Sequence, residues 1–419
     1  MSYSKYLIVG SSHAGLSALE AIRVRDPEGS LTLVTREDHL PYSPTILPYV
    51  VSGHVSPERV FLRYEDDMER LGVDFRRKAK VVAVDSANHH VTLESGETLE
   101  YGKLLLATGA APTLPPSPGV EDVPSHVLRD LEDALRLRSS MGRARSAIVL
   151  GAGLIAMHAA ENLAKGGLKV TVEVRSRVLR GYFDEQSAGL IQKIFSNNGI
   201  EVMAGKGISK VRRVNGGCAV SLDSGEEIAG DLLVVATGVK PSVGYLAGSG
   251  IQVDEGIIVD EKMRTSVTDV WAAGDVTQAS GFFDPAKKVD ATLPNAVEQG
   301  RVAGMDMVGD PHIKPYLGGI GLNTYNFFGN RAFSVGLSNV PPSARGVEVD
   351  QVFLPTSFKY QKLVFQEDRL VGVSAINMML DPGVMCQLVR RRVELKEFKG
   401  RLASEPLETG RILMSRIWR

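Results

Sequence analysis

The chain has 419 residues, of which 43% are hydrophobic and 23% are charged, and its formal net charge is −1. This length favours two or three domains, and the near-zero charge gives no support for a nucleic-acid or membrane-surface partner. The two cysteines, Cys218 and Cys386, lie far apart and outside any CxxC spacing, so neither a disulfide framework nor a metal site is expected. Residues 1–5 lead directly into the first predicted strand and leave no room for a signal peptide, and no apolar run could span a bilayer. The cytoplasm is the default location.

A glycine-rich loop is the first feature in chain order. Residues 7–9 predict a buried strand, residues 10–15 (GSSHAG) follow at once, and apolar residues then recur at helical spacing. A strand, a glycine loop and a helix in this order favour a bound pyrophosphate at the helix N-terminus. Ser12 replaces the usual middle glycine, and Glu37 follows a second strand at 31–34, where it could bind a ribose. The alternative is an ordinary strand–loop–helix turn without a ligand.

The next segment combines a shaped loop with a hairpin. Residues 41–49 contain three prolines and predict a loop that leads into a short helix. Residues 81–84 and 90–93 alternate as an antiparallel hairpin would, and residues 104–109 predict a buried strand that ends in Ala-Thr-Gly. Four prolines within 112–118 indicate a linker to the next domain.

A second copy of the opening unit begins at residue 147. Residues 147–150 predict a strand, residues 151–156 match GxGxxA, a helix ends near residue 166, and residues 169–174 predict the following strand. A second Ala-Thr-Gly strand end comes at 236–238. One such loop is weak support for dinucleotide binding, but two in this order indicate an internal duplication.

The last third changes character. Residues 270–275 predict a strand that ends in Gly-Asp, and a helix is expected to open at 295–301. From about residue 315 the pattern becomes strand-rich (332–335, 362–366 and 370–375), with helical sequence over 384–398. The predicted fold is α/β, with two Rossmann-like domains and a C-terminal α+β domain. The pattern change places the last domain at 315–419, and the family resemblance described next implies that 1–112 joins 240–314 in one domain and that 113–239 forms the other.

These motifs resemble the pyridine nucleotide–disulfide oxidoreductases, the flavoproteins with two dinucleotide-binding domains, over nearly the whole chain. The similarity is greatest to NADH oxidases, coenzyme A disulfide reductases, ferredoxin or rubredoxin reductases and NAD-linked flavin subunits. It implies FAD on the first loop and NAD(P)H on the second, with Asp275 binding the ribityl chain and the helix at Asn295 facing the flavin pyrimidine. The alternative for Asp275 is an N-cap or turn aspartate. The implied FAD residues are Gly10, Ser12, His13, Ala14, Gly15, Glu37, Thr108, Gly109, Gly274, Asp275, Asn295 and Ala296, and the implied NAD(P)H residues are Gly151, Gly153, Leu154, Ile155, Arg175 and Gly238.

The chain departs from this family at its redox cysteine. Thr45, which follows Pro44, stands where the cysteine-using members carry that residue. Threonine forms neither a thiolate nor a disulfide, so disulfide and peroxide-reducing chemistry is not expected. By this resemblance Thr45 and Pro44 occupy the catalytic position, and electrons must pass directly between flavin and acceptor.

The nicotinamide site has two further departures. His158 stands where the family commonly has glutamate, and an ordinary buried helix histidine is preferred over a flavin-tuning role. Val174 falls near the position where an acid would favour NAD, whereas Arg175, Arg177 and Arg180 could hold a 2′-phosphate. Glu173 is one position away, and surface arginines are often only solvated, so both NAD and NADP stay open with a slight preference for NADP.

The favoured function is an FAD-dependent NAD(P) oxidoreductase that exchanges electrons with an iron–sulfur protein or subunit, within a larger complex. The alternatives are a free-standing NAD(P)H oxidase that reduces oxygen, and a redox-sensing flavoprotein without catalysis. Activity with a one-electron dye separates the redox-sensing flavoprotein, which should have none, from the two enzymes. Co-purifying iron- or tungsten-containing subunits would favour the complex.

The C-terminal tail suggests a partner surface. Arginines and lysines recur from residue 390, and residues 411–419 add Ile412, Leu413 and Trp418 to further arginines. Tryptophan and arginine often anchor interfaces, so the tail could dock on a second copy of this chain or on an acidic iron–sulfur protein. The equally weighted alternative is a terminal helix that packs on its own domain.

Overall fold

The computed structural model describes residues 2–341 and 343–417. Contacts divide the chain into two compact units. The first comprises Met1–Ile46, Ser56–Ala111 and Val239–Gly319, and the second comprises Leu47–Val55, Pro112–Gly238 and Ile320–Arg419. The predicted fold class, mixed α/β with Rossmann-like parallel sheets, is confirmed. The three-domain boundaries stay a prediction.

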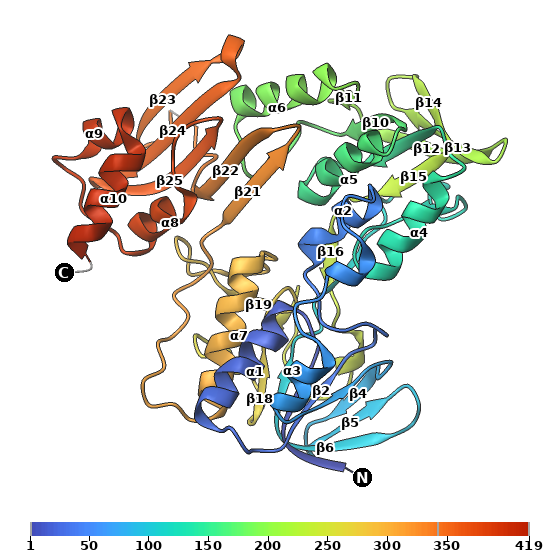
Figure 1. The fold of residues 1–419 in the computed structure, drawn as a ribbon, viewed down its shortest axis with the longest axis vertical. Helices are drawn as coiled ribbons and strands as arrows, with labels where there is room; N and C mark the ends of the chain where they lie inside the picture. Colours follow the sequence, from blue (N-terminus) through green and yellow to red (C-terminus); the bar gives the residue numbers. More distant parts are fainter. Residues whose placement is uncertain (1, 342, 418–419) are drawn as a thin grey trace. The chain divides into compact units, whose positions relative to one another are not determined.

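The main sheet of the first unit has strand order β3-β2-β1-β6-β5-β4. In addition, β18 pairs in parallel with the end of β6 (Figure 1). The apolar run at 31–34 forms a strand with the predicted bounds, and the hairpin at 81–93 is antiparallel as predicted. Parallel pairing places Val9 opposite Val34 and Leu106, so the loops after these strands share one edge. The strands are β1 (Ser2–Val9), β2 (Leu31–Val34), β3 (Val73–Arg76), β4 (Val81–Asp85), β5 (His90–Leu93), β6 (Thr98–Leu106) and β18 (Val270–Ala272).

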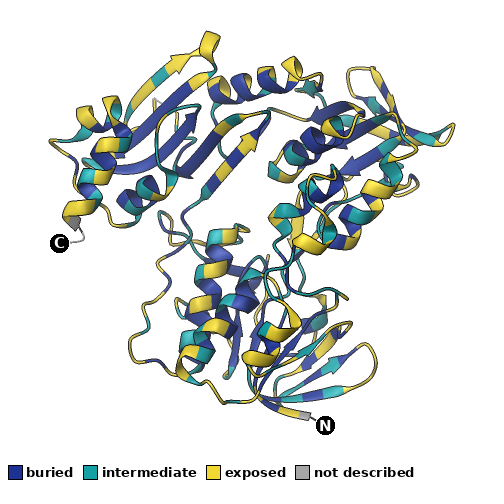
Figure 2. Cartoon of the chain, viewed as in Figure 1, coloured by how far each residue is buried: buried dark blue, intermediate teal, exposed yellow. Residues whose placement is uncertain are grey.

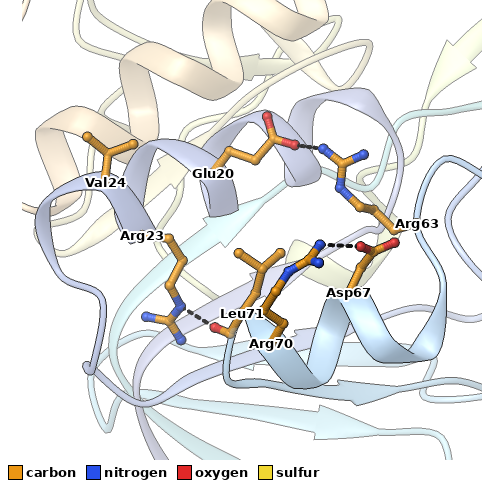
Figure 3. A pocket seen from close by; sticks show the side chains of 7 residues that line it. All are labelled: Glu20, Arg23, Val24, Arg63, Asp67, Arg70 and Leu71. Carbon is orange, nitrogen blue, oxygen red and sulfur yellow. Dashed lines mark hydrogen bonds and ion pairs between the residues drawn. The ribbon is translucent and has the colours of Figure 1, made fainter.

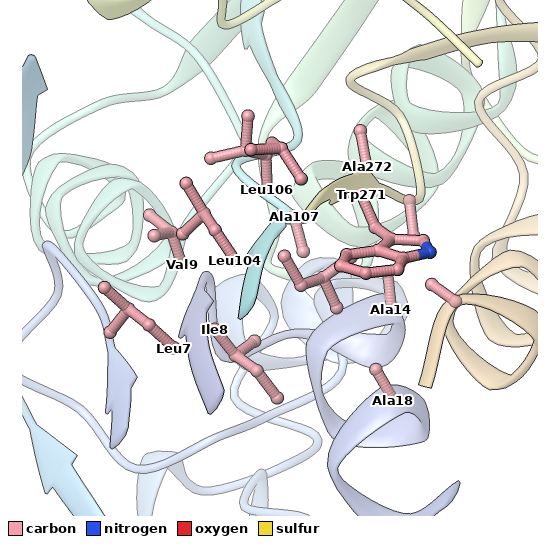
Figure 4. Close-up of a cluster of buried hydrophobic side chains, with 14 of the residues drawn as sticks. Leu7, Ile8, Val9, Ala14, Ala18, Leu104, Leu106, Ala107, Trp271 and Ala272 are labelled. Atoms are coloured by element: carbon pink, nitrogen blue, oxygen red, sulfur yellow. The ribbon is translucent and has the colours of Figure 1, made fainter. Parts of the chain in front are cut away.

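Helices α1 (His13–Arg25) and α7 (Leu293–Met307) pack on the first unit's sheet. Figure 4 shows Ile8 of β1 beside Ala14 and Ala18 of α1, with the indole of Trp271 next to them. The buried indole Nε1 donates to Asp306 Oδ2 at 2.9 Å, which fixes β18 against α7. The predicted loop at 41–49 holds a 3₁₀ turn (Pro44–Ile46) and leads into α2 (Leu47–Val51). The smaller elements are α3 (Glu65–Arg70), β7 (Ala110–Pro112), β16 (Val239–Pro241), β17 (Ile257–Ile258), β19 (Thr277–Ser280) and β20 (Lys287–Lys288).

The second unit begins with a parallel sheet of order β11-β10-β9-β15-β8. The predicted strand at 169–174 is β10, and the predicted helix after the second glycine loop is α5, which ends at Lys165. An antiparallel β12-β13-β14 sheet follows. The elements are β8 (Ser125–His126), α4 (Leu131–Met141), β9 (Ser146–Leu150), α5 (Leu154–Lys165), β10 (Lys169–Val174), α6 (Glu185–Asn197), β11 (Glu201–Ala204), β12 (Ile208–Val214), β13 (Gly217–Leu222), β14 (Glu227–Gly230) and β15 (Leu232–Val235).

An antiparallel sheet of order β21-β22-β25-β24-β23 forms the C-terminal part of the second unit. Figure 2 shows its central strands β24 and β25 buried and its edge strand β23 largely exposed, in agreement with their burial patterns. The strands expected at 332–335, 362–366 and 370–375 are therefore confirmed. The strands are β21 (Leu322–Phe327), β22 (Asn330–Gly336), β23 (Glu348–Leu354), β24 (Lys359–Gln366) and β25 (Arg369–Ile376).

The helix predicted over 384–398 is wrong in its length. Helix α8 spans Pro382–Arg390 and begins at Asp381, whose carboxylate accepts the N–H groups of Gly383 and Val384. It ends because Arg392 adopts a left-handed conformation (φ +49°) and the Val393 N–H turns back to the Leu388 carbonyl at 3.2 Å. Apolar periodicity continued beyond this turn and hid it.

The tail forms two more helices, α9 (Lys399–Ser404) and α10 (Pro406–Ile417). Leu413 is buried, and the Arg416 guanidinium lies 5.2 Å from the centre of the Phe398 ring. These contacts favour the alternative in which the tail packs on its own domain, while Trp418 lies outside the described residues. No helix within the described residues combines the length and the apolar run that a membrane crossing requires.

Candidate functional site

The first glycine loop turns sharply at the end of β1. Gly10 has φ +115°, and a Cβ on it would lie 2.2 Å from the Ala107 carbonyl oxygen. A Cβ on Gly15 would lie 1.9 Å from the Gly10 carbonyl oxygen, so α1 starts directly against the loop. Ser12 is the N-cap of α1, and its hydroxyl caps no backbone group. The first N–H groups of α1, from His13 onward, have no partner within the helix and suit an anion.

Three of the predicted FAD residues meet where β18 and α7 approach this loop. A Cβ on Gly274 would lie 3.1 Å from the Ala14 Cβ and 3.6 Å from the Ala296 Cβ. Gln299 Oε1 accepts hydrogen bonds from the Gly274 N–H at 2.8 Å and from the Thr277 hydroxyl at 2.8 Å. This buried amide therefore holds the Gly-Asp turn in place.

Acidic and polar groups gather at the N-terminus of α7. Asn295 Nδ2 donates to the Asp290 carbonyl at 3.5 Å. Burial raises the pKa of Asp290, the Asn295 amide and the charge of Lys288 lower it, and the charge of Asp275 raises it. Thr292 is the N-cap of α7, and its buried hydroxyl has no partner within the described residues. Buried polar atoms are nearly always hydrogen-bonded, so the Thr292 hydroxyl fits a site that a polar ligand completes.

A chain of hydrogen bonds joins the loop to the predicted redox position. His13 Nε2 lies 2.9 Å from Ser43 Oγ, which lies 2.8 Å from Thr45 Oγ1. Burial lowers the pKa of His13, although Asp275 opposes this, so the imidazole is neutral at pH 7. Thr45 is exposed and Pro44 is half-buried, both in the 3₁₀ turn.

The remaining FAD predictions fall on residues with structural partners. The Tyr42 hydroxyl donates to Glu37 Oε2 at 2.5 Å, beyond the end of β2. The Thr108 hydroxyl donates to the Ser242 carbonyl at 3.1 Å, and the Ser242 N–H donates to the Gly109 carbonyl at 3.0 Å. Thr108 and Gly109 therefore anchor the returning segment at 239–245, and their contact with FAD stays a prediction.

The residues of the first unit fit FAD in three respects. Gly10, Gly15 and Gly274 leave space that a side chain would fill, the N-terminus of α1 presents free N–H groups, and α7 presents an unpartnered hydroxyl. When bound, FAD accepts a hydride and passes on single electrons. The assignment of individual residues to it stays a prediction.

The second glycine loop repeats the geometry of the first. Gly151 has φ +103°, and a Cβ on it would lie 2.4 Å from the Ala236 carbonyl oxygen, as with Gly10 and Ala107. Gly153 is the exposed N-cap of α5, Leu154 is the first helical residue, and Ile155 is exposed. Gly238 adopts φ +142°, and its carbonyl accepts the Thr113 N–H at 3.0 Å. The loop thus has the backbone geometry of the first loop, and a pyrophosphate bound to it stays a prediction.

The end of β10 separates the two candidate ribose ligands. Glu173 is only 3% exposed, and burial raises its pKa to about 7; nearby Asp223 raises it further and Arg175 opposes this. Arg175 is exposed, whereas Arg177 donates to the Phe183 carbonyl at 3.2 Å and to Asn339 Oδ1 at 3.2 Å. Of the residues weighed for the ribose, Arg175 and Arg180 are therefore both charged and exposed, and Arg175 directly follows the last residue of β10.

His158 lies half-buried on α5, with Nδ1 3.9 Å from Glu161 Oε2 and its ring centre 6.4 Å from that of Tyr49. Burial lowers its pKa, Glu161 raises it, and Lys165 lowers it. Glu161 is held by Lys165 at 2.7 Å and by the Phe328 N–H at 2.8 Å. The buried Nδ1 of His158 has no hydrogen-bond partner within the described residues, so this environment does not separate an ordinary packed histidine from a flavin-tuning role.

Three supporting residues of α7 were missed by the sequence reasoning. Gln299 orients the Gly-Asp turn, and a Cβ on Gly300 would lie 2.1 Å from the Ala14 carbonyl oxygen. A Cβ on Gly304 would lie 2.5 Å from the Ala18 carbonyl oxygen, so α1 and α7 touch backbone to backbone. The GxxxG spacing of Gly300 and Gly304 was the available signal, because small residues one turn apart let helices approach closely.

A pocket of about 560 Å³ lies on the first unit between α1 and α3 (Figure 3). Its arginines are engaged within the protein, because Arg63 pairs with Glu20, Arg70 pairs with Asp67, and Arg23 donates to the Leu71 carbonyl. None of the residues predicted from the sequence lines this pocket.

Known proteins match nearly the whole chain. The family model described as pyridine nucleotide-disulphide oxidoreductase matches residues 4–300. The NADH-dependent phenylglyoxylate dehydrogenase subunit epsilon of Aromatoleum evansii is 48% identical, over 100% of this chain and 99% of the relative. An NADH oxidase of Methanocaldococcus jannaschii is 30% identical, over 88% and 87%. The solved ferredoxin reductase of Rhodopseudomonas palustris has the same fold, with a TM-score of 0.80 and 24% identity over 93% of this chain and 100% of that one.

Proposed function

The chain belongs to the pyridine nucleotide-disulphide oxidoreductase family, and we propose that it is a flavin subunit that exchanges electrons between NAD(P)H and an iron–sulfur protein or subunit. The family assignment makes it an FAD- and NAD(P)H-dependent oxidoreductase. The proposal adds the acceptor, the surrounding complex and the residues that serve them.

The placement of the cysteines carries this proposal. The sequence of the first unit, which holds the FAD loop, contains no cysteine. Cys218 of β13 and Cys386 of α8 are buried in the second unit, and burial raises the pKa of the Cys218 thiol to about 11. With Thr45 at the redox position, no residue of the first unit offers a thiol that could store electrons.

The chain's residues supply binding and orientation. Gly10 and Gly274 leave space for FAD to approach the protein backbone, and Asp275 is the proposed ligand of the ribityl chain. Asn295 and the N-terminus of α7 favour negative charge at the pyrimidine end. Neutral His13 can receive a proton at Nε2 or pass one through Ser43 to the exposed Thr45 hydroxyl.

The complex is inferred from the whole-length relative. The subunit epsilon named above is called NADH-dependent and belongs to a phenylglyoxylate dehydrogenase, and phenylglyoxylate is a 2-oxo acid. We therefore propose a 2-oxo acid dehydrogenase complex, in which other subunits hold the iron–sulfur centres. The described residues contain no group of three or more histidine, cysteine or carboxylate side chains placed to hold a metal ion.

The native protein tests this proposal. The chain, tagged and expressed in its native host and purified anaerobically, should co-purify with iron-containing subunits. The purified complex should couple oxidation of a 2-oxo acid to NAD(P)+ reduction. Isolation of the chain alone, with full activity towards oxygen, would reject the complex.

A free-standing NADH oxidase is the second candidate, favoured by the 30% identical relative of that name. Rates of NADH oxidation with oxygen and with a one-electron dye separate the two. We expect the dye rate to exceed the oxygen rate at least tenfold. For the location we propose the cytoplasm, since the two cysteines lie far apart in the sequence and outside any CxxC spacing, a pattern that gives no sign of a disulfide framework.

A further inference from the structure

The segment that joins β10 to α6 is held by the C-terminal sheet and by the loop that follows its strand β22. Asn339 spans two points of it, because its Nδ2 donates to the Arg180 carbonyl at 2.7 Å and its Oδ1 accepts from Arg177 at 3.2 Å. The hydroxyl of Ser338 donates to the Tyr182 carbonyl at 2.9 Å. Residues 177–184 thus take part of their hydrogen bonds from residues more than 150 positions further along the chain.

Lys362 is the deepest of these attachments. Its side chain is 0% exposed, and its ammonium lies 3.1 Å from Asp184 Oδ2 and 2.6 Å from the Val340 carbonyl oxygen. The Tyr360 hydroxyl donates to the same carboxylate oxygen. Burial opposes ionisation of Asp184, but the hydroxyls of Tyr360 and Ser187 hold its pKa below the usual range. A buried lysine is rare unless it is paired, and here it is paired with the N-cap of α6.

The attachment is built into the register of the sheet. Strand pairing aligns one polar residue from each strand in a single row across the sheet, with Lys362 between Ser374 and Gln351. Directly paired residues point to the same face, so this row faces one side. On that side Gln351 also bonds Gln186 of α6. The row is Asn323, Ser334, Ser374, Lys362 and Gln351.

The same segment also holds the second glycine loop. The Leu179 N–H donates to the Ala152 carbonyl at 2.8 Å, inside GxGxxA. Leu179 is buried and left-handed (φ +50°), a conformation that persists only when the surroundings enforce it. Contacts therefore run without a gap from the C-terminal sheet, through residues 177–184, to the loop that would bind the pyrophosphate.

We propose that the C-terminal sheet and the loop after its strand β22 position the NAD(P)H-binding loops, with Lys362 of the sheet and Asn339 of the loop as the positioning residues, and so set the affinity for the adenosine diphosphate half of the nucleotide. The proposal rests on the assignment of the second loop to NAD(P)H. Neither residue touches the nucleotide. They act through residues 177–184 on the Ala152 carbonyl and on the exposed Arg175 next to that segment.

ADP-ribose tests this directly, because it carries the adenosine and pyrophosphate but no nicotinamide. Its Kd is measured by calorimetry on FAD-loaded protein, together with KM and kcat for NAD(P)H in dye reduction. Asn339→Ala removes the two bonds of a half-buried side chain, and Lys362→Met removes the buried ammonium. Lys399→Met is the matched control, since its ion pairs are with Glu348 and Asp368.

Asn339→Ala and Lys362→Met should each raise the Kd for ADP-ribose and the KM roughly tenfold, with kcat within about twofold, because a misplaced binding loop costs affinity. Lys399→Met should change neither constant. Should Lys362→Met fail to fold, Asn339→Ala decides alone. Wild-type affinity in a folded Asn339→Ala protein overturns the positioning role. Wild-type protein that neither binds ADP-ribose nor accepts electrons from NAD(P)H would overturn the proposed function itself, and the positioning role with it.

Discussion

Glu173 should make the stability of the second unit depend on pH, and one substitution should abolish this contribution. The ordinary pKa of this carboxyl is 4.5, and burial raises it to about 7 in the folded protein. Between these values the folded state holds a proton that the unfolded state releases, so stability is full below about pH 4.5 and falls as the pH rises towards 7. At about 1.4 kcal/mol for each pKa unit, the loss reaches about 3 kcal/mol.

Glu173→Gln keeps the shape of the protonated acid and cannot ionise. At pH 8 the variant should exceed the wild type in stability by up to about 3 kcal/mol, and at pH 5 the two should be nearly equal. Thermal unfolding followed by circular dichroism measures this as a Tm difference, at roughly 2–4 °C per kcal/mol for a unit of this size. Comparing the two proteins at each pH cancels the groups they share. A Tm difference that is the same at pH 5 and pH 8 would show that Glu173 is ionised in the folded state.

Four further variants test the candidate sites. Asp275→Ala should release FAD during dialysis at limiting FAD, because a charge-assisted hydrogen bond of about 1.5–3 kcal/mol is lost; unchanged occupancy would reject the ribityl assignment. Gly300→Val should give little folded, FAD-loaded protein, since its Cβ would lie 2.1 Å from a backbone oxygen; wild-type yield and flavin content would contradict the close helix contact. Arg175→Ala should raise the KM for NADPH about tenfold and leave that for NADH within twofold; equal KM values for NADPH before and after would exclude Arg175 as the phosphate ligand. Replacing both Cys218 and Cys386 by serine should leave dye reduction intact in folded protein, and its loss would mean that a thiol takes part.

The sequence predicted best where local pattern and local structure coincide. The strands at Leu31–Val34 and Lys169–Val174 have the predicted bounds because short apolar runs are followed by polar or charged residues. Each glycine loop lies between a strand and a helix as expected, since the sharp turn needs residues that adopt positive φ, such as Gly10 and Gly151.

Long-range contacts were beyond such reasoning. The end of α8 depends on a turn at Arg392 that apolar periodicity does not reveal. The close approach of Gly300 to Ala14 brings together helices α7 and α1, which lie at opposite ends of the nucleotide-binding part of the sequence. The buried pair of Lys362 and Asp184 requires knowledge of strand register, and a lysine in a strand otherwise suggests a solvent-exposed position.

Anaerobic titration of the purified, FAD-loaded protein with NADH tests the central claim most directly, namely that electrons leave the flavin without passing through a thiol pair. Flavin absorbance should bleach completely at one equivalent of NADH per FAD, with the same end point in the protein that lacks both cysteines. An end point near two equivalents, which falls to one when Cys218 and Cys386 are replaced, would show a redox-active thiol pair and contradict the account.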